Sequence, residues 1–347
     1  MNMNQTDRQG PIFWRGGVLV FFSLILAATL LLSGCKGDSQ KTETAPPQAT
    51  PSQTAPAAPA MNAADFDPPA GTPPAPKVDG KRAMQYTKDI VAFGPRPIGS
   101  DTHRKVEDYI KSKLQGAQIE EDKFTADTAA GKFPVNNIIA KYPGKKDGII
   151  VLASHYDTNY PLRNENFVGA NDGAATSALL IEIGNQLMAH PPQGYSVWLL
   201  FTDAEEATVQ WSDTDSVYGS KHLANRWAKE GTAKKIKAFI LLDMIGDKDL
   251  NVDRETNSTP WLQEVVGRSA QRLGKESYFY KRDQTIDDDH IPFKNVGIPV
   301  VDLIDFSYGW DNIFHHTTED TVDKLSPQSL QTVGDVVLES IRALNTK

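Results

Sequence analysis

The chain of 347 residues contains almost no cysteine and no excess of positive charge. Its single cysteine, Cys35, excludes a disulfide bond within one chain. The 36 lysine and arginine residues are outnumbered by 44 aspartate and glutamate residues, so the formal net charge is -8. Proteins that bind nucleic acid usually carry a basic face or stripe. We therefore expect no nucleic acid partner.

The apolar stretch near the start of the chain is too short to cross a bilayer. Residues 18–32, "VLVFFSLILAATLLL", fall short of the roughly 20 residues that span a bilayer, and Arg8 and Arg15 precede them. This pattern is typical of the apolar core of an export signal. It leads into "LSGC", residues 32–35, which resembles the signal-peptidase box of bacterial lipoproteins.

The first 80 residues are therefore expected to address and tether the protein. Residues 1–35 are interpreted as a lipoprotein signal, and lipidation of Cys35 would anchor an exported protein on the periplasmic or extracellular side of a membrane. The alternative is an ordinary cleaved signal with an incidental Cys35. Residues 36–80 are predicted to be a disordered tether, because residues 41–80 hold ten of the 22 prolines and bury little apolar surface. Residues 81–347 are long enough for one large domain.

In this domain, predicted buried strands alternate with helices. Continuous apolar runs are typical of strands covered on both faces, and other segments have the apolar spacing of helices. The alternation predicts an α/β fold, a single-domain three-layer sandwich with a mostly parallel central sheet and helices on both faces. The expected strands are residues 136–142, 148–157, 195–201, 236–246 and 296–306, and the expected helices are residues 103–114, 174–188 and 327–344.

Potential metal ligands follow three of these strands. His155 ends one strand, the acidic residues of 203–206 follow the next, and Asp243 ends the third. Asp172 precedes a helix, and residues 315–316, both histidines, follow the last strand. Alone, residues 203–206 could mark a strand emerging into solvent, and Asp172 could belong to a turn with a helix cap. Because sites in α/β sheets form beyond the carboxyl ends of strands, their convergence favours a metal site.

The residue types suit zinc. Zn²⁺ binds imidazole nitrogen and carboxylate oxygen, and a catalytic site typically has three protein ligands and an open position. The neighbours Glu205 and Glu206 point in different directions along the chain. One can therefore bind the metal while the other transfers protons.

Several short motifs, taken in order, resemble the zinc aminopeptidase and glutaminyl cyclase superfamily over about residues 81–347. These motifs are "FGPRPIGS", "ASHYDT", "GANDGA", "DAEE", "LLDMIGD" and "HHTTEDTVDKL". Two further segments, "DAEEATVQWSDTDSVYGSKHLA" and "DDDHIPF", resemble the glutaminyl-peptide cyclotransferase branch.

The resemblance implies that residues 81–347 form a zinc-dependent catalytic domain. By that likeness Asp172, Glu206 and His316 bind one zinc ion. The ligand positions of the two-zinc aminopeptidases are also present, so His155 and Asp243 are candidates for holding a second zinc ion. Ligand identity alone leaves the number of zinc ions open.

The resemblance also assigns catalytic and substrate-binding residues. Glu205 is expected to be the acid/base, and Asp243 with Asp288 to form a carboxylate network beside it. Trp211 is expected to line the pocket for the N-terminal side chain of the substrate.

Two features depart from the animal cyclases. His315 stands where those enzymes have a tryptophan, and the loop 305–314 is longer, so we interpret Trp310 as a replacement wall of the pocket. The role of His315 stays open. "GANDGA" is closer to the aminopeptidases.

These observations predict a zinc-dependent glutaminyl-peptide cyclotransferase. It would convert N-terminal glutamine of peptides or proteins to pyroglutamate with release of ammonia, and would contact the membrane only through the lipid on Cys35. One alternative is a di-zinc aminopeptidase that removes N-terminal residues from exported peptides. Another is a non-catalytic binding lipoprotein that keeps the fold.

Overall fold

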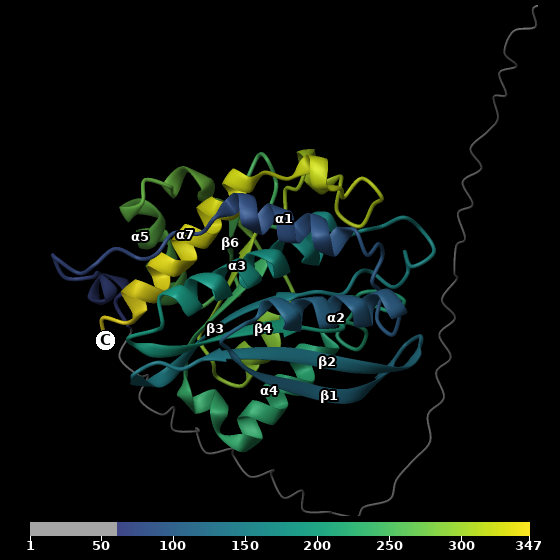
Figure 1. Ribbon diagram of the computed structural model, residues 1–347, viewed down its shortest axis with the longest axis horizontal. Helices are drawn as coiled ribbons and strands as arrows, with labels where there is room; N and C mark the ends of the chain where they lie inside the picture. Colours follow the sequence, from purple (N-terminus) through teal and green to yellow (C-terminus); the bar gives the residue numbers. More distant parts are fainter. Residues whose placement is uncertain (1–60) are drawn as a thin grey trace, which may run out of the picture. The chain divides into compact units, whose positions relative to one another are not determined.

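The computed structural model describes residues 61–347 (Figure 1), so the predicted signal, Cys35 and the first part of the predicted tether lie outside the described residues. Its centre is a six-stranded sheet with the strand order β1-β2-β4-β3-β5-β8. The four strands β4, β3, β5 and β8 are mutually parallel, and β2 is antiparallel to both of its neighbours. The strands are β1 (Gln118–Thr128), β2 (Gly131–Tyr142), β3 (Lys146–His155), β4 (Tyr195–Thr202), β5 (Ile236–Asp243) and β8 (Val300–Ile304).

The predicted mostly parallel sheet is confirmed, and its central strands are the apolar runs. From Ile150 to Ala153, every side chain of β3 is fully buried, as expected for a strand covered on both faces. Strand β1 was not predicted. Its residues are mostly charged or polar and most are at least partly exposed, because β1 is the edge strand of a hairpin with β2.

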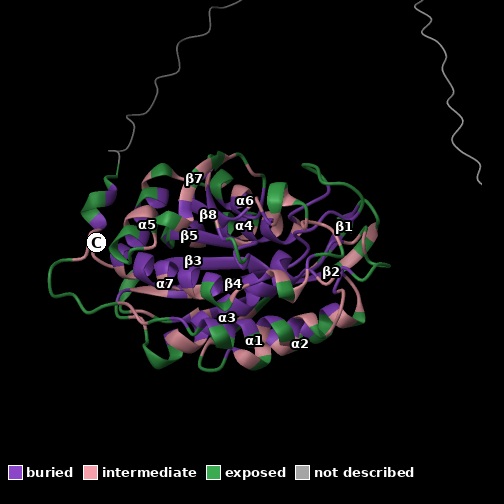
Figure 2. Cartoon of the chain, turned by 90° about the horizontal axis from the view of Figure 1, so that it is seen from above, coloured by how far each residue is buried: buried purple, intermediate pink, exposed green. Residues whose placement is uncertain are grey.

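Helices cover both faces of the sheet, which confirms the three-layer sandwich. On one face lie α1 (Gly80–Val91), α2 (Asp101–Lys113), α3 (Thr176–Ala189), α5 (Pro260–Arg272) and α7 (Pro327–Leu344). On the other face lie α4 (Tyr218–Glu230) and the short α6 (His290–Asn295), with Trp227 and Phe293 packed together. Figure 1 shows α4 across the sheet from α1, α3 and α7, and Figure 2 shows the buried residues concentrated between the layers.

A second, two-stranded parallel sheet was not predicted from the sequence. It pairs β6 (Val252–Glu255) with β7 (Phe279–Gln284). Strand β6 has only four residues, which are too few for an apolar periodicity to be recognised in the sequence.

The predicted tether extends too far along the sequence, because Ala63, Phe66 and Val78, which fall within it, are buried against the domain. Phe66, in the short helix Ala63–Phe66, is buried and stacks on Trp261 with ring centroids 5.2 Å apart. Asp67 forms ion pairs with the guanidinium groups of Arg268 and Arg272. The prediction for this part was wrong because average composition does not reveal one aromatic and one acidic side chain with specific partners.

Among residues 61–347, no helix has both the length and the apolar character needed to cross a membrane.

Candidate active site and metal centre

The carboxyl ends of the central parallel strands open into one cavity of about 340 Å³. β3 ends at His155, β5 ends at Asp243, and Glu205 follows β4 by three residues. Most of the predicted site residues line this cavity, which is bounded by Asp172, Glu205, Glu206, Trp211, Asp243, Met244, Thr285, Ile286, Asp287, Asp288, Ile304, Phe306, His315 and His316.

Asp172 is held in an interrupted helical turn before α3. Its ψ of 90° and the φ of 87° at Gly173 are non-helical. A side chain at Gly173 would place Cβ only 2.9 Å from the His155 ring, so glycine permits this close approach. The buried carboxylate of Asp320 accepts hydrogen bonds from the backbone N–H groups of Asn171 and Asp172, at 2.8 and 3.1 Å.

Asp172 joins two groups of potential metal ligands. Its Oδ2 lies 3.4 Å from Nε2 of His316, and the same nitrogen lies 3.2 Å from Oε1 of Glu206. Its Oδ1 lies 3.0 Å from Nε2 of His155, which is also 3.5 Å from Oδ1 of Asp243. The predicted zinc ligands and the predicted second-metal residues therefore meet at one carboxylate.

The residues at this site fit a zinc ion. Oδ2 of Asp172 and Oδ1 of Asp243 are buried without a hydrogen-bond partner, which is costly unless a cation satisfies them. Burial alone would raise the pKa of Asp172, but the adjacent imidazoles of His155 and His316 hold that pKa well below its usual range. An ionised carboxylate beside imidazole nitrogens is a donor set that Zn²⁺ prefers.

Asp157 orients the paired glutamates. Its two carboxylate oxygens accept hydrogen bonds from the backbone N–H groups of Glu205 and Glu206, each at 3.3 Å. Ala204 has a φ of 54°, a left-handed conformation that is uncommon for a residue with a side chain and that occurs at functional sites. Glu206 reaches His316, and Oε2 of Glu205 lies 3.8 Å from Nδ1 of His155. The two side chains thus contact different partners.

Glu205 belongs to a group of buried carboxylates. Burial raises the pKa of Glu205 well above its usual range, and the negative charges of Glu206 and Asp288 raise it further. Burial and the charge of Asp243 likewise raise the pKa of Asp288, whose Oδ2 has no hydrogen-bond partner. Such a group readily takes up and releases a proton inside the cavity.

The apolar wall of the cavity differs from the prediction in one respect. Trp211 lines the cavity and is 37 % exposed, but Trp310 is 86 % exposed and lines a separate surface hollow. The interpretation of Trp310 as a pocket wall was therefore wrong. That side of the cavity is formed by Phe306 and His315, whose rings meet edge to face 5.3 Å apart, and His315 packs on His316. Burial and the adjacent His316 lower the pKa of His315 to about 4.

Two supporting residues have roles that were not predicted. Arg96, within the "FGPRPIGS" motif, is fully buried, and its guanidinium donates to the carbonyl oxygens of Tyr156, Gly169 and Asp172 at 2.7, 2.9 and 3.1 Å. Asp320 lies in the "HHTTEDTVDKL" motif. Both residues hold the backbone around Asp172. The signal available in the sequence was a charged residue inside a motif rich in Gly and Pro for Arg96, and inside a motif rich in Thr for Asp320.

Asp203 is a structural residue, although it lies two residues before Glu205 in the sequence. Its Oδ1 lies 2.7 Å from Nε2 of the buried His103, and its Oδ2 accepts the backbone N–H of Asn136 at 2.7 Å. It lies outside the cavity lining and connects α2 to the sheet.

The family model for peptidase family M28 matches residues 137–341. The chain belongs to peptidase family M28. The chain is also similar to the glutaminyl-peptide cyclotransferase of Boiga irregularis, with 31 % identity over 279 residues that cover 69 % of this chain and 74 % of that protein. The predicted membership of the zinc aminopeptidase superfamily, on its glutaminyl cyclase branch, is confirmed.

Solved structures agree with the fold. A glutaminyl cyclase from an Acidobacteriales bacterium is 52 % identical, with a TM-score of 0.78 over 80 % of this chain and 98 % of that chain. A leucine aminopeptidase precursor from Bacteroides thetaiotaomicron is 26 % identical, with a TM-score of 0.69 over 77 % of this chain and 98 % of that chain. A glutaminyl cyclase and a leucine aminopeptidase precursor therefore share this architecture.

Proposed function

We propose that this M28 protein is a zinc-dependent glutaminyl-peptide cyclotransferase that acts on N-terminal glutamine of peptides and proteins. The observation that carries the proposal is that the carboxylates of Glu205, Asp243 and Asp288 line the same cavity as the candidate zinc ligands. The 52 % identity to a glutaminyl cyclase supports the same activity.

The reaction transfers an acyl group within one residue. The α-amine nitrogen of the substrate attacks its own γ-carbonyl carbon, a C–N bond forms, and the bond to the side-chain amide nitrogen breaks. Glu205 takes the proton that the amine loses and delivers it to the departing nitrogen, which leaves as ammonia. Asp288 and Asp243 accept hydrogen bonds from that nitrogen. Because nucleophile and electrophile belong to the same residue, their proximity is already supplied.

Zinc would be held by Asp172, Glu206 and His316, and when bound it supplies a Lewis acid for the γ-carbonyl oxygen. Trp211 would contact the glutamine side chain from the apolar side. Burial of Glu205 favours this scheme, because the raised pKa makes its carboxylate a stronger proton acceptor.

A di-zinc aminopeptidase is the second candidate, favoured by one observation. His155, Asp172 and Asp243 offer ligand atoms that lie within 4.8 Å of one another, so a second ion has a place to bind. In that case Glu205 would deprotonate water. The leucine aminopeptidase precursor among the structural neighbours supports keeping this alternative.

Mass spectrometry of peptides after incubation separates the two functions. A Gln-led peptide and a Leu-led peptide of otherwise equal sequence are compared, with the Glu205→Gln variant as the control for contaminating activity. A cyclotransferase releases ammonia from the Gln-led peptide and leaves its residue count unchanged. Loss of the first residue from either peptide would instead establish the aminopeptidase.

We also propose that the protein is an exported lipoprotein anchored through Cys35. The sequence of residues 18–35 supports this, because the apolar stretch ends at "LSGC". Mass spectrometry of the N-terminal peptide of the mature protein tests it. An acylated Cys35 at the N-terminus is expected, and a free N-terminus beyond Cys35 would contradict the anchor.

A further inference from the structure

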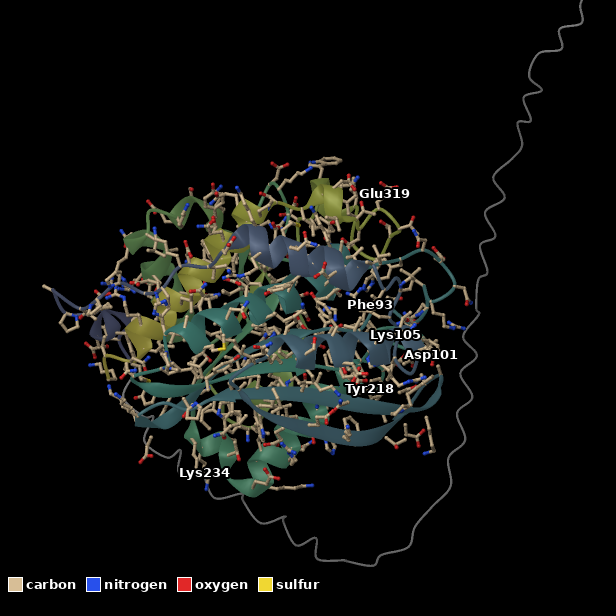
Figure 3. All side chains as sticks on the ribbon, viewed as in Figure 1. Phe93, Asp101, Lys105, Tyr218, Lys234 and Glu319 are labelled. Carbon is tan, nitrogen blue, oxygen red and sulfur yellow. The ribbon has the colours of Figure 1, made fainter. Side chains whose placement is uncertain are left out.

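The amino ends of the parallel strands carry exposed lysines that the proposed reaction does not use. Lys145 and Lys146 lie at the start of β3, Lys234 and Lys235 lie in the short helix before β5, and Lys237 is the second residue of β5. All five are exposed, and we call them the lysine edge. Figure 3 places Lys234 well away from Asp101, Tyr218 and Glu319.

These lysines come from different segments but lie together. β3 and β5 pair at Ile149 and Ile236; Ile149 lies three residues after Lys146, and Ile236 lies between Lys235 and Lys237. The side chain of Lys237 runs past Gly148, where a Cβ would lie 2.9 Å from its Cε. The neighbouring acidic side chains in sequence are Asp147 and Glu230, so lysine predominates although the whole chain is acidic.

The lysine edge and the active site lie at opposite ends of the same strands. β3 begins at Lys146 and ends at His155. A strand of this length is about 30 Å long, at about 3.3 Å per residue. A flat surface that touched the lysine edge would therefore leave the cavity open to solvent on the far side.

The chain enters the domain near the lysine edge. Nζ of Lys146 donates hydrogen bonds to the carbonyl oxygen of Asn345 and to a terminal carboxylate oxygen of Lys347, at 2.7 and 2.8 Å. Nζ of Lys347 in turn lies 3.7 Å from Asp65 and over the ring of Phe66. The first described residues therefore lie beside the lysine edge. The 26 peptide links from Cys35 to Met61 span at most about 90 Å, so a membrane that holds Cys35 lies within reach.

We propose that the lysine edge binds the headgroups of an anionic bilayer and turns the active-site cavity away from the membrane. A lipid anchor alone limits distance and leaves orientation free, whereas a basic patch adds a second signal. Each lysine near an anionic leaflet contributes about a fivefold gain in binding, and the gain disappears beyond a Debye length. The cavity would then face the solution from which peptide N-termini arrive. This inference goes beyond the catalytic proposal and uses the proposed anchor at Cys35, but it replaces the expectation that the lipid is the only contact with the membrane.

Two cysteine reporters in the full-length protein test the orientation. Gln193→Cys, exposed just before β4, reports on the lysine edge, and Glu165→Cys, exposed beyond the end of β3, reports on the active-site edge. Each is labelled with a fluorophore and placed on vesicles of phosphatidylcholine, with or without phosphatidylglycerol, that contain nitroxide lipids as quenchers. Mass spectrometry first establishes whether Cys35 is acylated. If it is not, both reporters are made in a Cys35→Ser background.

If the lysine edge binds the bilayer, the reporter at position 193 should be quenched and the reporter at position 165 should not. This quenching should occur only with phosphatidylglycerol and should decrease at high salt. Replacing Lys234, Lys235 and Lys237 by glutamate should abolish this contrast. In the matched control, the exposed Lys105, Lys123 and Lys132, which lie in α2, β1 and β2, are replaced by glutamate. This control should leave the quenching contrast intact.

Equal quenching of both reporters, or a contrast that survives the Lys234, Lys235 and Lys237 replacements, would overturn the proposal. Turnover of a soluble Gln-led peptide should be unchanged in both triple variants, which establishes that they are folded. If no form of the protein turns over the peptide but the quenching contrast is present, the proposed activity is wrong and the proposed membrane binding by the lysine edge is retained.

Discussion

The carboxylate of Asp320 accepts a hydrogen bond from the backbone N–H of Asp172 at 3.1 Å. A residue of the last loop thereby fixes the carboxylate that both ligand groups share. The same carboxylate also accepts the hydroxyl hydrogen of Tyr308 at 2.7 Å. The position of Asp172, the proposed central zinc ligand, therefore depends on a residue that does not line the cavity.

Asp320→Asn should weaken zinc binding, because an amide accepts hydrogen bonds at its oxygen but not at its nitrogen. One backbone N–H group of the turn that holds Asp172 therefore loses its partner. A loss of about 10- to 100-fold in zinc affinity is expected for such an outer partner. Competition with a zinc chelator measures it. The control is Glu319→Gln, since Glu319 is its exposed neighbour and its side chain forms an ion pair with Lys324. Equal zinc affinity in Asp320→Asn and wild type would show that the turn holds Asp172 without Asp320.

His103 and Asp203 should stabilise the fold in a pH-dependent way. Burial alone would lower the pKa of His103, but the negative charge and hydrogen bond of Asp203 raise it to about 10. Because the folded-state pKa exceeds the ordinary value of 6.5, this stabilisation is complete below pH 6.5 and is lost as the pH rises toward 10. Breaking such a buried pair typically costs about 3–5 kcal/mol.

His103→Gln is the variant that measures this contribution. The free energy of unfolding in denaturant should fall by about 3 kcal/mol or more near pH 6.5, and the difference from wild type should shrink as the pH approaches 10. A difference that stays constant over this range would mean that His103 is uncharged in the folded protein.

Trp211 and Trp310 should behave differently when each is replaced by alanine. Trp211 lines the cavity, so Trp211→Ala removes apolar contact with the substrate and should lower kcat/KM for a Gln-led peptide by roughly 10- to 100-fold. Trp310 lies in a separate hollow, and Trp310→Ala should leave kcat/KM within about twofold of wild type. Steady-state kinetics on one peptide tests both. A larger loss in Trp310→Ala than in Trp211→Ala would restore the sequence-based assignment of the wall.

Much of the fold could be predicted because burial leaves a mark on composition. The central strand from Ile150 to Ala153 is apolar throughout, and only a strand covered on both faces requires that. β1 left no such mark, since an edge strand can be polar. Phe66 was overlooked because a single buried aromatic side chain in a Pro-rich segment has no periodicity.

The site could be predicted where a residue follows a strand, and not where loop conformation decides. His155 and Asp243 are strand ends, so topology alone brings them together. Trp310 was misassigned because Asp311 and Asn312 have φ values of 59° and 60°, which no pattern of residue types revealed. Asp157 supports the paired glutamates by accepting hydrogen bonds from their backbone N–H groups. Because the backbone is the same for nearly every residue type, the sequence gives no sign of such a partner.

The zinc content and turnover of Glu205→Gln, measured on the same preparation, test the central assignment most directly. Glutamine keeps the size of the side chain but cannot accept a proton, so zinc per chain should match wild type while kcat falls by about 10²–10⁴-fold and KM changes little. In Glu206→Gln, zinc content and activity should fall together. If Glu205→Gln loses its zinc, or keeps most of its activity, the division of roles between Glu205 and Glu206 is wrong.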